Sequence, residues 1–144
     1  MAYGGFNRVV KSDSGDAWDG SYSFAATDNS ETLNLNGFRR VCFWFDVGTA
    51  SGTSPTLDPT LEFSPDGGTT WCSYPAAVNS QTAQGITQIT DSNDEQAHME
   101  YYEHLVNGPN VRYRLVMTLG GSSTPTFADL EVRVIGWDRV DGSV

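Results

Sequence analysis

The stretch that decides the fold is RRVCFWFDV, residues 39–47. In an extended strand, successive side chains point to opposite sides. Val41, Phe43 and Phe45 therefore fall on one side of this stretch, and Cys42 and Trp44 fall on the other. A strand that is apolar on both sides is typical of a central position in a packed structure. The stretch predicts β-structure around a buried core.

The same signals extend outward along the chain as short apolar or alternating runs bounded by Gly, Pro, Asn, Asp and Ser. Expected strands lie at 6–11, 21–26, 31–35, 39–47, 60–64, 70–74, 85–90, 110–119 and 127–137. The segment 94–106 fits either a helix capped by Asn93 or a strand, and the turn at 107–110 favours the strand. About nine or ten short antiparallel strands predict an all-β fold, a β-sandwich of jelly-roll type.

Two expected loops have similar sequences. Residues 52–57 read GTSPTL, and residues 122–127 read SSTPTF. Each precedes an expected strand, where proline fixes φ and threonine starts the strand. We interpret them as two similar entries into strands and not as an internal duplication.

The length of the chain indicates its number of domains, and its net charge limits the partners that it can bind. The chain has 144 residues, which predicts a single domain over 1–144 with a flexible N-terminal arm at about 1–6 and a short tail at about 138–144. The formal net charge of −10 argues against nucleic acid and anionic membranes as partners. The start lacks the basic and apolar regions of a signal peptide, so we expect a protein made in a cytoplasm.

The two cysteines, Cys42 and Cys72, have no zinc or redox spacing. Both lie in apolar strand-like runs, where a buried thiol is the ordinary interpretation. Whether they pair across the core stays open.

Candidate chemistry is sparse. His98, Glu100 and His104 would bind a metal only if all three faced one way. Asp13, Asp16 and Asp19 lack the alternating ligands of an EF-hand calcium loop and are read as solvated turn residues. No nucleophile elbow and no phosphate-binding loop occur. We therefore expect a protein that is not an enzyme, with no catalytic residues, no metal and no cofactor.

The most recognisable motif is SPDGGTTW, residues 64–71. It matches the Ser-x-Asp-x-Gly-x-Thr-Trp pattern called an Asp-box, which recurs in sialidase-like propellers far from their active sites. We expect Asp66 to accept hydrogen bonds from turn amides and Trp71 to cap a small core beneath the hairpin. The motif predicts a structural hairpin whose key residues are Ser64, Asp66, Gly68, Thr70 and Trp71.

The remaining tryptophans divide by position. Trp44, like Trp71, lies on a central expected strand and is predicted to be in the core. Trp18 and Trp137 lie near the chain ends, so we expect them to contact a partner. Tyr3 and Phe6 in the arm are further candidate partner contacts.

The order of signals resembles small virion proteins of tailed bacteriophages. The resemblance covers roughly residues 40–135 and rests on five stretches, SGTSPTL at 51–57, FSPDGGTTW at 63–71, VRYRL at 111–115, LGG at 119–121 and PTF at 125–127. It implies a β-sandwich or jelly-roll subunit that decorates a capsid or sits in a tail. Such decoration proteins commonly form trimers and clamp neighbouring subunits of the shell. The family has no catalytic motif, so no catalytic residue carries over.

Three functions follow as expectations. The first is a capsid decoration or cement protein on the virion surface, a homotrimer bound to the major capsid protein. The second is a tail or adaptor subunit of the same kind of particle. The third is a carbohydrate-binding module displayed on a virion.

Overall fold

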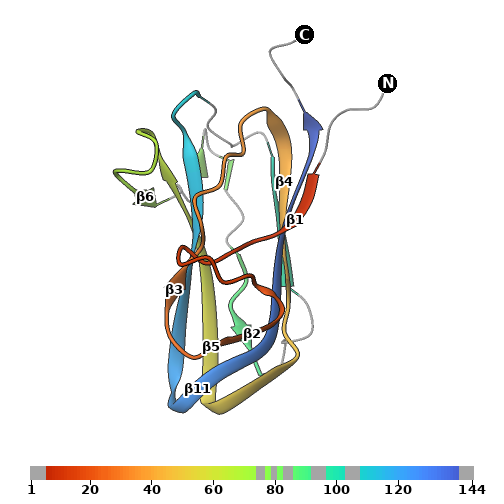
Figure 1. Ribbon diagram of the computed structural model, residues 1–144, viewed down its shortest axis with the longest axis vertical. Helices are drawn as coiled ribbons and strands as arrows, with labels where there is room; N and C mark the ends of the chain where they lie inside the picture. The colour runs from red at the N-terminus through yellow and green to blue at the C-terminus, as the bar shows by residue number, and fades with distance from the viewer. Residues whose placement is uncertain are drawn as a thin grey trace.

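The computed structural model describes residues 6–73, 77–78, 81–82, 86–91, 97–102 and 108–139. All regular elements in these ranges are β-strands (Figure 1). They are β1 (Phe6–Val9), β2 (Asp19–Phe24), β3 (Asp28–Asn29), β4 (Phe38–Asp46), β5 (Thr49–Ser64), β6 (Cys72–Ser73), β7 (Ala77–Val78), β8 (Gln81–Thr82), β9 (Ile89–Thr90), β10 (Ala97–Tyr102) and β11 (Arg112–Arg139). The all-β prediction is confirmed.

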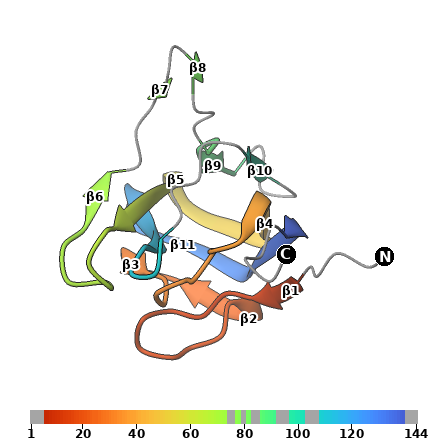
Figure 2. The same cartoon turned by 90° about the horizontal axis from the view of Figure 1, so that it is seen from above.

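The strands form one curled antiparallel sheet of nine strands, with β7 and β8 as a separate two-stranded ribbon. The main order is β10-β4-β11-β5-β6. Strands β1, β2 and β3 also pair with β11, and β9 pairs with β5. Figure 2 shows the sheet from above, curling so that β4 and β5 both lie beside β11.

Strand β11 is the strand with the most pairing partners, because it pairs with β1, β2, β3, β4 and β5. Its first part pairs with β5 from Arg112↔Ser64 to Ala128↔Thr49, and its last part pairs with β4 from Glu131↔Asp46 onward. The sequence predicted two strands at 110–119 and 127–137, separated by a loop. The structure instead has one strand that bends between them. The two segments lie beside each other, and the pairs Ser122↔Thr53 and Thr126↔Ser51 keep them in the sheet despite two register shifts.

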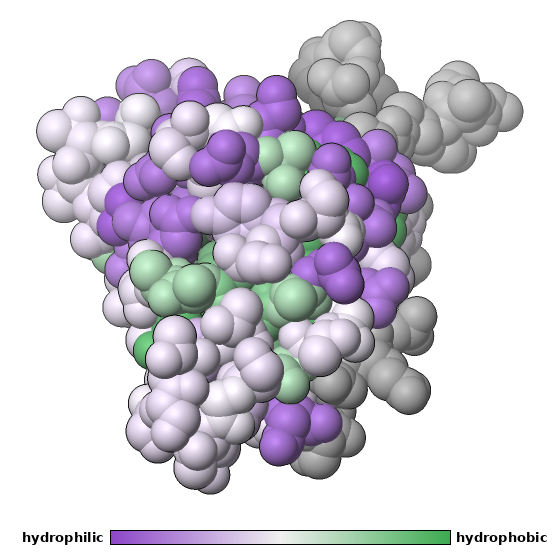
Figure 3. Space-filling view, turned by 60° about the horizontal axis from the view of Figure 1, so that its bottom comes forward, coloured by the Kyte–Doolittle hydropathy of each residue, from purple (hydrophilic) through white to green (hydrophobic). Residues whose placement is uncertain are grey.

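We call this bend the corner and define it as residues 49–57 and 119–127. Figure 1 shows both long strands turning at the end of the molecule that lies opposite β1 and the end of β11. Thr53 donates a hydrogen bond from Oγ1 to Oγ of Ser123 across it, at 3.2 Å. The corner contains no charged residue, and Figure 3 shows its surroundings as largely pale surface with green apolar areas.

Two glycines allow the corner to form. Gly52 and Gly121 have φ of +100° and +112°, a region that other residues rarely adopt. A Cβ at Gly121 would lie 2.9 Å from the carbonyl oxygen of Ser54, and one at Gly52 would lie 2.8 Å from Cα of Pro125. The two backbones therefore approach too closely at these points for a side chain.

The strand changes its inward face just after the corner. Up to Phe127, the last residue of the corner, odd-numbered residues such as Leu115 are buried. From Leu130 onward, even-numbered residues such as Val134 are buried. The register shifts between Phe127 and Leu130, where Asp129 has φ of +55°. This bulge reverses the side-chain alternation, so both halves of β11 face the same core.

The core lies inside the curl. Its fully buried members include Val41, Phe43 and Phe45 from β4, as predicted. The other side of β4 is different, because Cys42 and Trp44 are only half-buried. The prediction that Trp44 lies in the core is wrong. Strand β4 does have β10 and β11 as neighbours, so it is central within the sheet although only one of its faces is buried in the core.

The structure confirms some of the other predicted elements and corrects the bounds or type of others. The strand interpretation of 94–106 is confirmed for Ala97–Tyr102, which pairs with β4, so the helix alternative is wrong there. The predicted strand at 31–35 is reduced to an isolated bridge between Leu33 and Tyr113. Phe6, expected in the arm, begins β1 opposite Gly136, and β11 continues to Arg139 into the expected tail. Residues 1–5 and 140–144 lie outside the described residues.

Candidate functional site

The Asp-box turn is built as the sequence predicted. Asp66 Oδ1 accepts hydrogen bonds from the amides of Thr69 (3.1 Å) and Thr70 (2.8 Å). Ser64 is buried; its Oγ donates to Asp66 Oδ1 at 2.7 Å and accepts from the Gly68 amide at 2.8 Å. These two side chains accept hydrogen bonds from most of the backbone amides of the turn, and the Gly67 amide donates to the Asn110 carbonyl, which identifies the turn as a structural motif.

These bonds alter the acidity of Asp66. The Thr70 amide, followed by the hydroxyl of Ser64, holds the pKa of the Asp66 carboxyl at about 2, below its ordinary value of 3.8. Hydrogen bonds to the charged form stabilise the carboxylate. The turn is therefore organised around an ionised Asp66 at neutral pH.

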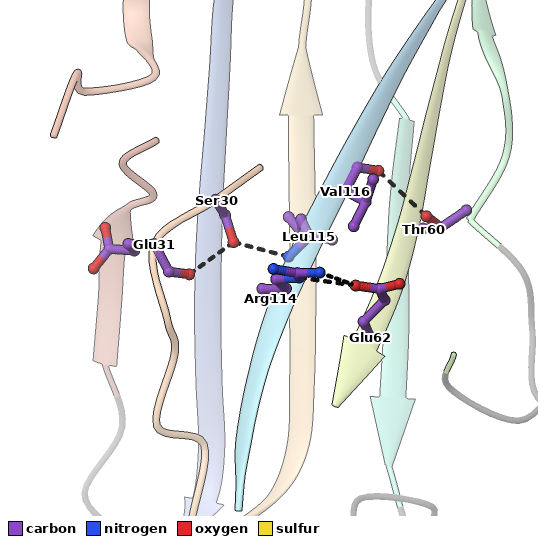
Figure 4. A network of polar contacts seen from close by, with 7 residues as sticks. All are labelled: Ser30, Glu31, Thr60, Glu62, Arg114, Leu115 and Val116. Carbon is purple, nitrogen blue, oxygen red and sulfur yellow. Dashed lines mark hydrogen bonds and ion pairs between the residues drawn. The ribbon is translucent and has the colours of Figure 1, made fainter. Parts of the chain in front are cut away.

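Trp71 is half-buried and is not a member of the buried core, so the prediction that it lies in the core is wrong. The guanidinium of Arg114 lies over it, with Cζ 4.4 Å from the ring centroid. Arg114 also pairs with Glu62, with Nη2 and Nε at 2.7 and 2.8 Å from Oε1. Figure 4 shows this ion pair bridging β11 and β5. These contacts join the hairpin to β11.

A second outward surface lies on β4 and the last part of β11, and we call it the Trp44 face. Its members are half-buried, and they alternate with the buried residues of the same strands. They are Cys42, Trp44, Asp46, Glu131, Arg133, Ile135 and Trp137. The register arranges them in rows, with Asp46 opposite Glu131, Trp44 opposite Arg133 and Cys42 opposite Ile135. The next row has Trp137 opposite Arg40.

The Trp44 face combines apolar and charged groups. Trp44, Ile135 and Trp137 supply aromatic and aliphatic surface that water reaches. Arg133 is held in place by contacts to Glu131 and, from Nη1, to Oδ1 of Asn7 at 3.2 Å. Apolar side chains on the outer side of a sheet contribute little to the core, so this surface is a candidate for recognition.

Trp18 is placed where the sequence did not predict. It is 0% exposed, so the expectation that it contacts a partner is wrong. Its backbone is tied into the sheet by a bond from its amide to the Val10 carbonyl (3.0 Å) and one from the Val132 amide to its carbonyl (2.9 Å). Its ring meets Phe24 edge-on with centroids 4.9 Å apart. The indole Nε1 is buried without a hydrogen-bond partner.

The remaining candidate partner contacts have different outcomes. Trp137 lies on the Trp44 face and stays a candidate, and Trp44 beside it is a candidate that sequence reasoning missed. The alternation in 39–47 already put Trp44 opposite the Phe43 side, which was the available signal. Tyr3 lies outside the described residues, and Phe6 is described only as the start of β1.

The candidate metal residues do not form a site in the part of the chain that the structure describes. No group of three His, Cys, Asp or Glu side chains there could hold a metal ion. Asp19 accepts bonds from the hydroxyl and amide of Ser21, at 2.6 and 3.1 Å, which lower the pKa of its carboxyl. His98 and Glu100 stand two residues apart on β10, and His104 lies outside the described residues.

The cysteines are not joined to each other by a disulfide. Cys42 is half-buried on the Trp44 face, whereas Cys72 is exposed on β6, so the expectation of a buried thiol is wrong for Cys72. Within the described ranges, no helix has the length and apolar character needed to cross a membrane.

Comparison with protein-family models gives no match for this chain, and comparison with curated proteins gives no significantly similar sequence.

Proposed function

We propose that this chain is a non-enzymatic structural subunit of a tailed-phage virion, a capsid decoration or cement protein. The observation that carries the proposal is the Trp44 face. Two tryptophans and an isoleucine are partly exposed on the outer side of a sheet whose inner side already supplies the core. Such side chains favour contact with another protein surface.

The rest of the fold supports the same role. A subunit that stabilises a shell must itself resist unfolding. The Asp-box bonds, the Arg114–Glu62 pair and the paired corner all link segments distant in sequence. We propose that the curled sheet belongs to the β-sandwich or jelly-roll type, which presents such faces on a rigid frame.

The partners follow from the same proposal. The protein binds the major capsid protein, assembles as a homotrimer and lies on the outside of the virion after synthesis in the host cytoplasm. A net charge of −10 suits a surface that faces water rather than packaged DNA. Closed rings of identical subunits are a common way to bury such faces.

The test is binding to purified shells. We expect the protein to sediment with expanded capsids and to raise the temperature at which they break. Trp44→Ser and Trp137→Ser should weaken this binding at least tenfold, because hot-spot tryptophans typically contribute 2 kcal/mol or more. Thr60→Ser, a change on an exposed residue of β5, is the control that should bind normally. Incorporation only into tails would replace the capsid role with the tail or adaptor role.

One observation favours a carbohydrate-binding function as the second candidate. Trp44 and Trp137 lie on the same outward face, about 14 Å apart as judged from strand and row spacings. Carboxylates and a guanidinium lie near Trp44, at Asp46, Glu131 and Arg133. Aromatic rings flanked by such groups suit a sugar. A glycan-array signal lost in Trp44→Ala and retained in Trp71→Ala would establish this alternative.

A further inference from the structure

Four strands of the sheet lie side by side and leave two open edges. Their order is β10-β4-β11-β1, where β11 takes part with its last portion, and every neighbouring pair is antiparallel. Among the strands that the structure describes, β10 pairs only with β4, and β1 pairs only with β11. Figure 2 shows β10 and β1 on opposite sides of β4 and β11. An unpaired edge offers backbone donors and acceptors to a further strand.

The two open edges belong to strands of opposite direction. Each contact in the series from β10 to β1 is antiparallel, and the four strands therefore begin and end on opposite directions. A second copy placed beside the first in the same orientation would bring its β10 to the β1 of the first copy. These two strands would then run antiparallel, as β1 and β11 do within one copy.

Strand alternation identifies the backbone groups that β1 presents at its open edge. The Val10 amide donates to the Val132 carbonyl at 2.8 Å. Since the backbone groups of successive residues in a strand point to opposite edges, Arg8 also bonds toward β11. Asn7 and Val9 then direct their N–H and C=O groups away from β11. Each of them supplies one donor and one acceptor to the open edge.

The same alternation continues across the sheet to β10. Because even-numbered residues in the last part of β11 bond toward β1, odd-numbered ones such as Arg133 bond toward β4. Trp44, which is opposite Arg133, bonds toward β11, so its neighbour Phe43 bonds toward β10. Met99 is opposite Phe43 and bonds back toward β4. The backbone groups at positions 98, 100 and 102 therefore point to the open edge of β10.

The two open edges also match in the face of the sheet. Asn7 stands opposite Ile135, and position 100 stands opposite Cys42. Ile135 and Cys42 both belong to the Trp44 face, and directly opposite residues in a strand pair share a face. The outward-bonding positions of both edges therefore lie on the Trp44 side. Joining the edges would extend one sheet without turning either copy over.

We propose that copies of this chain close into a ring in which β1 of each copy pairs with β10 of the next. This inference rests on the proposed trimer and names the contact that builds it. A rotation axis parallel to the strands relates the copies, so each copy uses both of its open edges and the ring leaves neither unpaired. The contact lies in the plane of the sheet, so the Trp44 face keeps its outer surface for the capsid protein.

Formal charge favours this pairing over contacts between identical edges. Residues 6–11, which contain β1, include Arg8 and Lys11 and no acid, and Arg8 pairs with Glu31 at 3.0 Å. Residues 91–103, which contain β10, include no lysine or arginine and have acids at Asp91, Asp94, Glu95, Glu100 and Glu103. A contact between two β10 edges would bring these acidic segments together, and like charges oppose such a contact. The β1 segment of another copy is the partner of opposite sign.

The test removes one backbone donor at the open edge of β1. Proline has no N–H and is tolerated on an edge strand where the N–H points outward, so Asn7→Pro should keep the fold. In analytical ultracentrifugation of the full chain, Asn7→Pro should raise the dissociation constant of the ring roughly tenfold, because each contact loses a hydrogen bond and leaves an acceptor unpaired. Asn7→Ala is the matched control. It removes the same side chain, including its contact with Arg133, but keeps the amide, so it should assemble like the wild type to within about threefold.

Hydrogen exchange provides a second measurement that needs no variant. When the wild-type chain is concentrated until rings form, exchange at the Asn7 and Val9 amides should slow roughly tenfold. The Arg8 amide already bonds toward β11, so its exchange should change by less than about threefold. Equal changes at Asn7 and Arg8, or no change at either, would contradict pairing at the open edge.

The outcomes separate this inference from the proposed function. Rings that Asn7→Pro disrupts and Asn7→Ala preserves would support the inference. A wild-type monomer at high concentration, or an assembly that Asn7→Pro leaves intact, would overturn it. Capsid binding is measured on the same variants. A capsid-binding chain that never forms rings would retain the function and reject the edge contact, whereas rings that bind no capsid would do the reverse.

Discussion

The corner provides the sharpest prediction about stability, and it compares Gly121→Ala with Gly15→Ala. Both glycines have a similar positive φ, +112° and +102°. A Cβ at Gly15 would meet nothing within 4 Å, whereas one at Gly121 would lie 2.9 Å from the Ser54 carbonyl oxygen and 3.0 Å from Cα of Pro55. The pair therefore separates the cost of the backbone conformation from the cost of close approach.

The magnitudes can be worked out from these contacts. A left-handed conformation costs a residue with a Cβ about 1–2 kcal/mol, and alanine recovers about 0.4–1 kcal/mol by restricting the unfolded chain. Gly15→Ala should thus lose about 0–1.5 kcal/mol. Gly121→Ala adds a contact with backbone atoms that cannot rotate away, and crowding of this kind costs about 1–3 kcal/mol more. The expected difference corresponds to roughly 2–12 °C in Tm for a chain of this length.

The assay is urea unfolding followed by tryptophan fluorescence, with the slope m expected to stay unchanged. Gly52→Ala, where a Cβ would lie 2.8 Å from Cα of Pro125, should behave like Gly121→Ala. Equal losses in Gly121→Ala and Gly15→Ala would refute the close approach of the two strands. The corner would then be an ordinary pair of turns.

Three further predictions follow from the same structure. The folded pKa of Asp66, about 2, lies below the ordinary 3.8. The stability that ionised Asp66 contributes is therefore complete above pH 3.8 and is lost as the pH falls through about 2. Asp66→Asn should flatten the curve of unfolding free energy against pH between about pH 4 and 2. Trp18→Ala should lose about 3–5 kcal/mol by opening a cavity, whereas Trp18→Phe should lose less than half of that because the buried indole N–H has no partner to lose; equal losses in urea unfolding would contradict this. Arg114→Lys should lose about 1 kcal/mol by thermal unfolding, since it removes both the planar stacking on Trp71 and the paired contacts to Glu62, and an unchanged Tm would show that these contacts are not stabilising.

The fold class was predictable because alternation is a local property. The alternation of residues 39–47 and the hydrogen bonds of the Asp-box turn both follow from neighbouring residues, and the structure has them as expected. The continuity of β11 was not predictable, because a GGSST segment normally marks a loop. Pairing with the GTS segment of β5, far away in sequence, keeps that segment in the sheet.

The candidate site was less accessible to sequence reasoning. Alternation shows that Trp44 and Phe43 face opposite sides, but it does not say which side has a second layer. The prediction that Trp18 contacts a partner was wrong for a related reason, since a position near the chain end suggests exposure. In the structure, pairing of its backbone with Val10 and Val132 draws it inside the curl. Both errors concern which surfaces meet, which depends on the whole topology.

The two errors together strengthen the case for recognition at the Trp44 face. Burial of Trp18 fills the interior of the curl, and the inner residues of β4 complete it. Trp44 and Trp137 are thus not required for the core, and threonine at either position would suit an outward strand site at least as well. Exposed tryptophan lowers solubility and promotes unwanted association. A chain that otherwise carries strong acidic charge retains two such residues in adjoining strands. The simplest physical reason is that another surface covers them in the working protein.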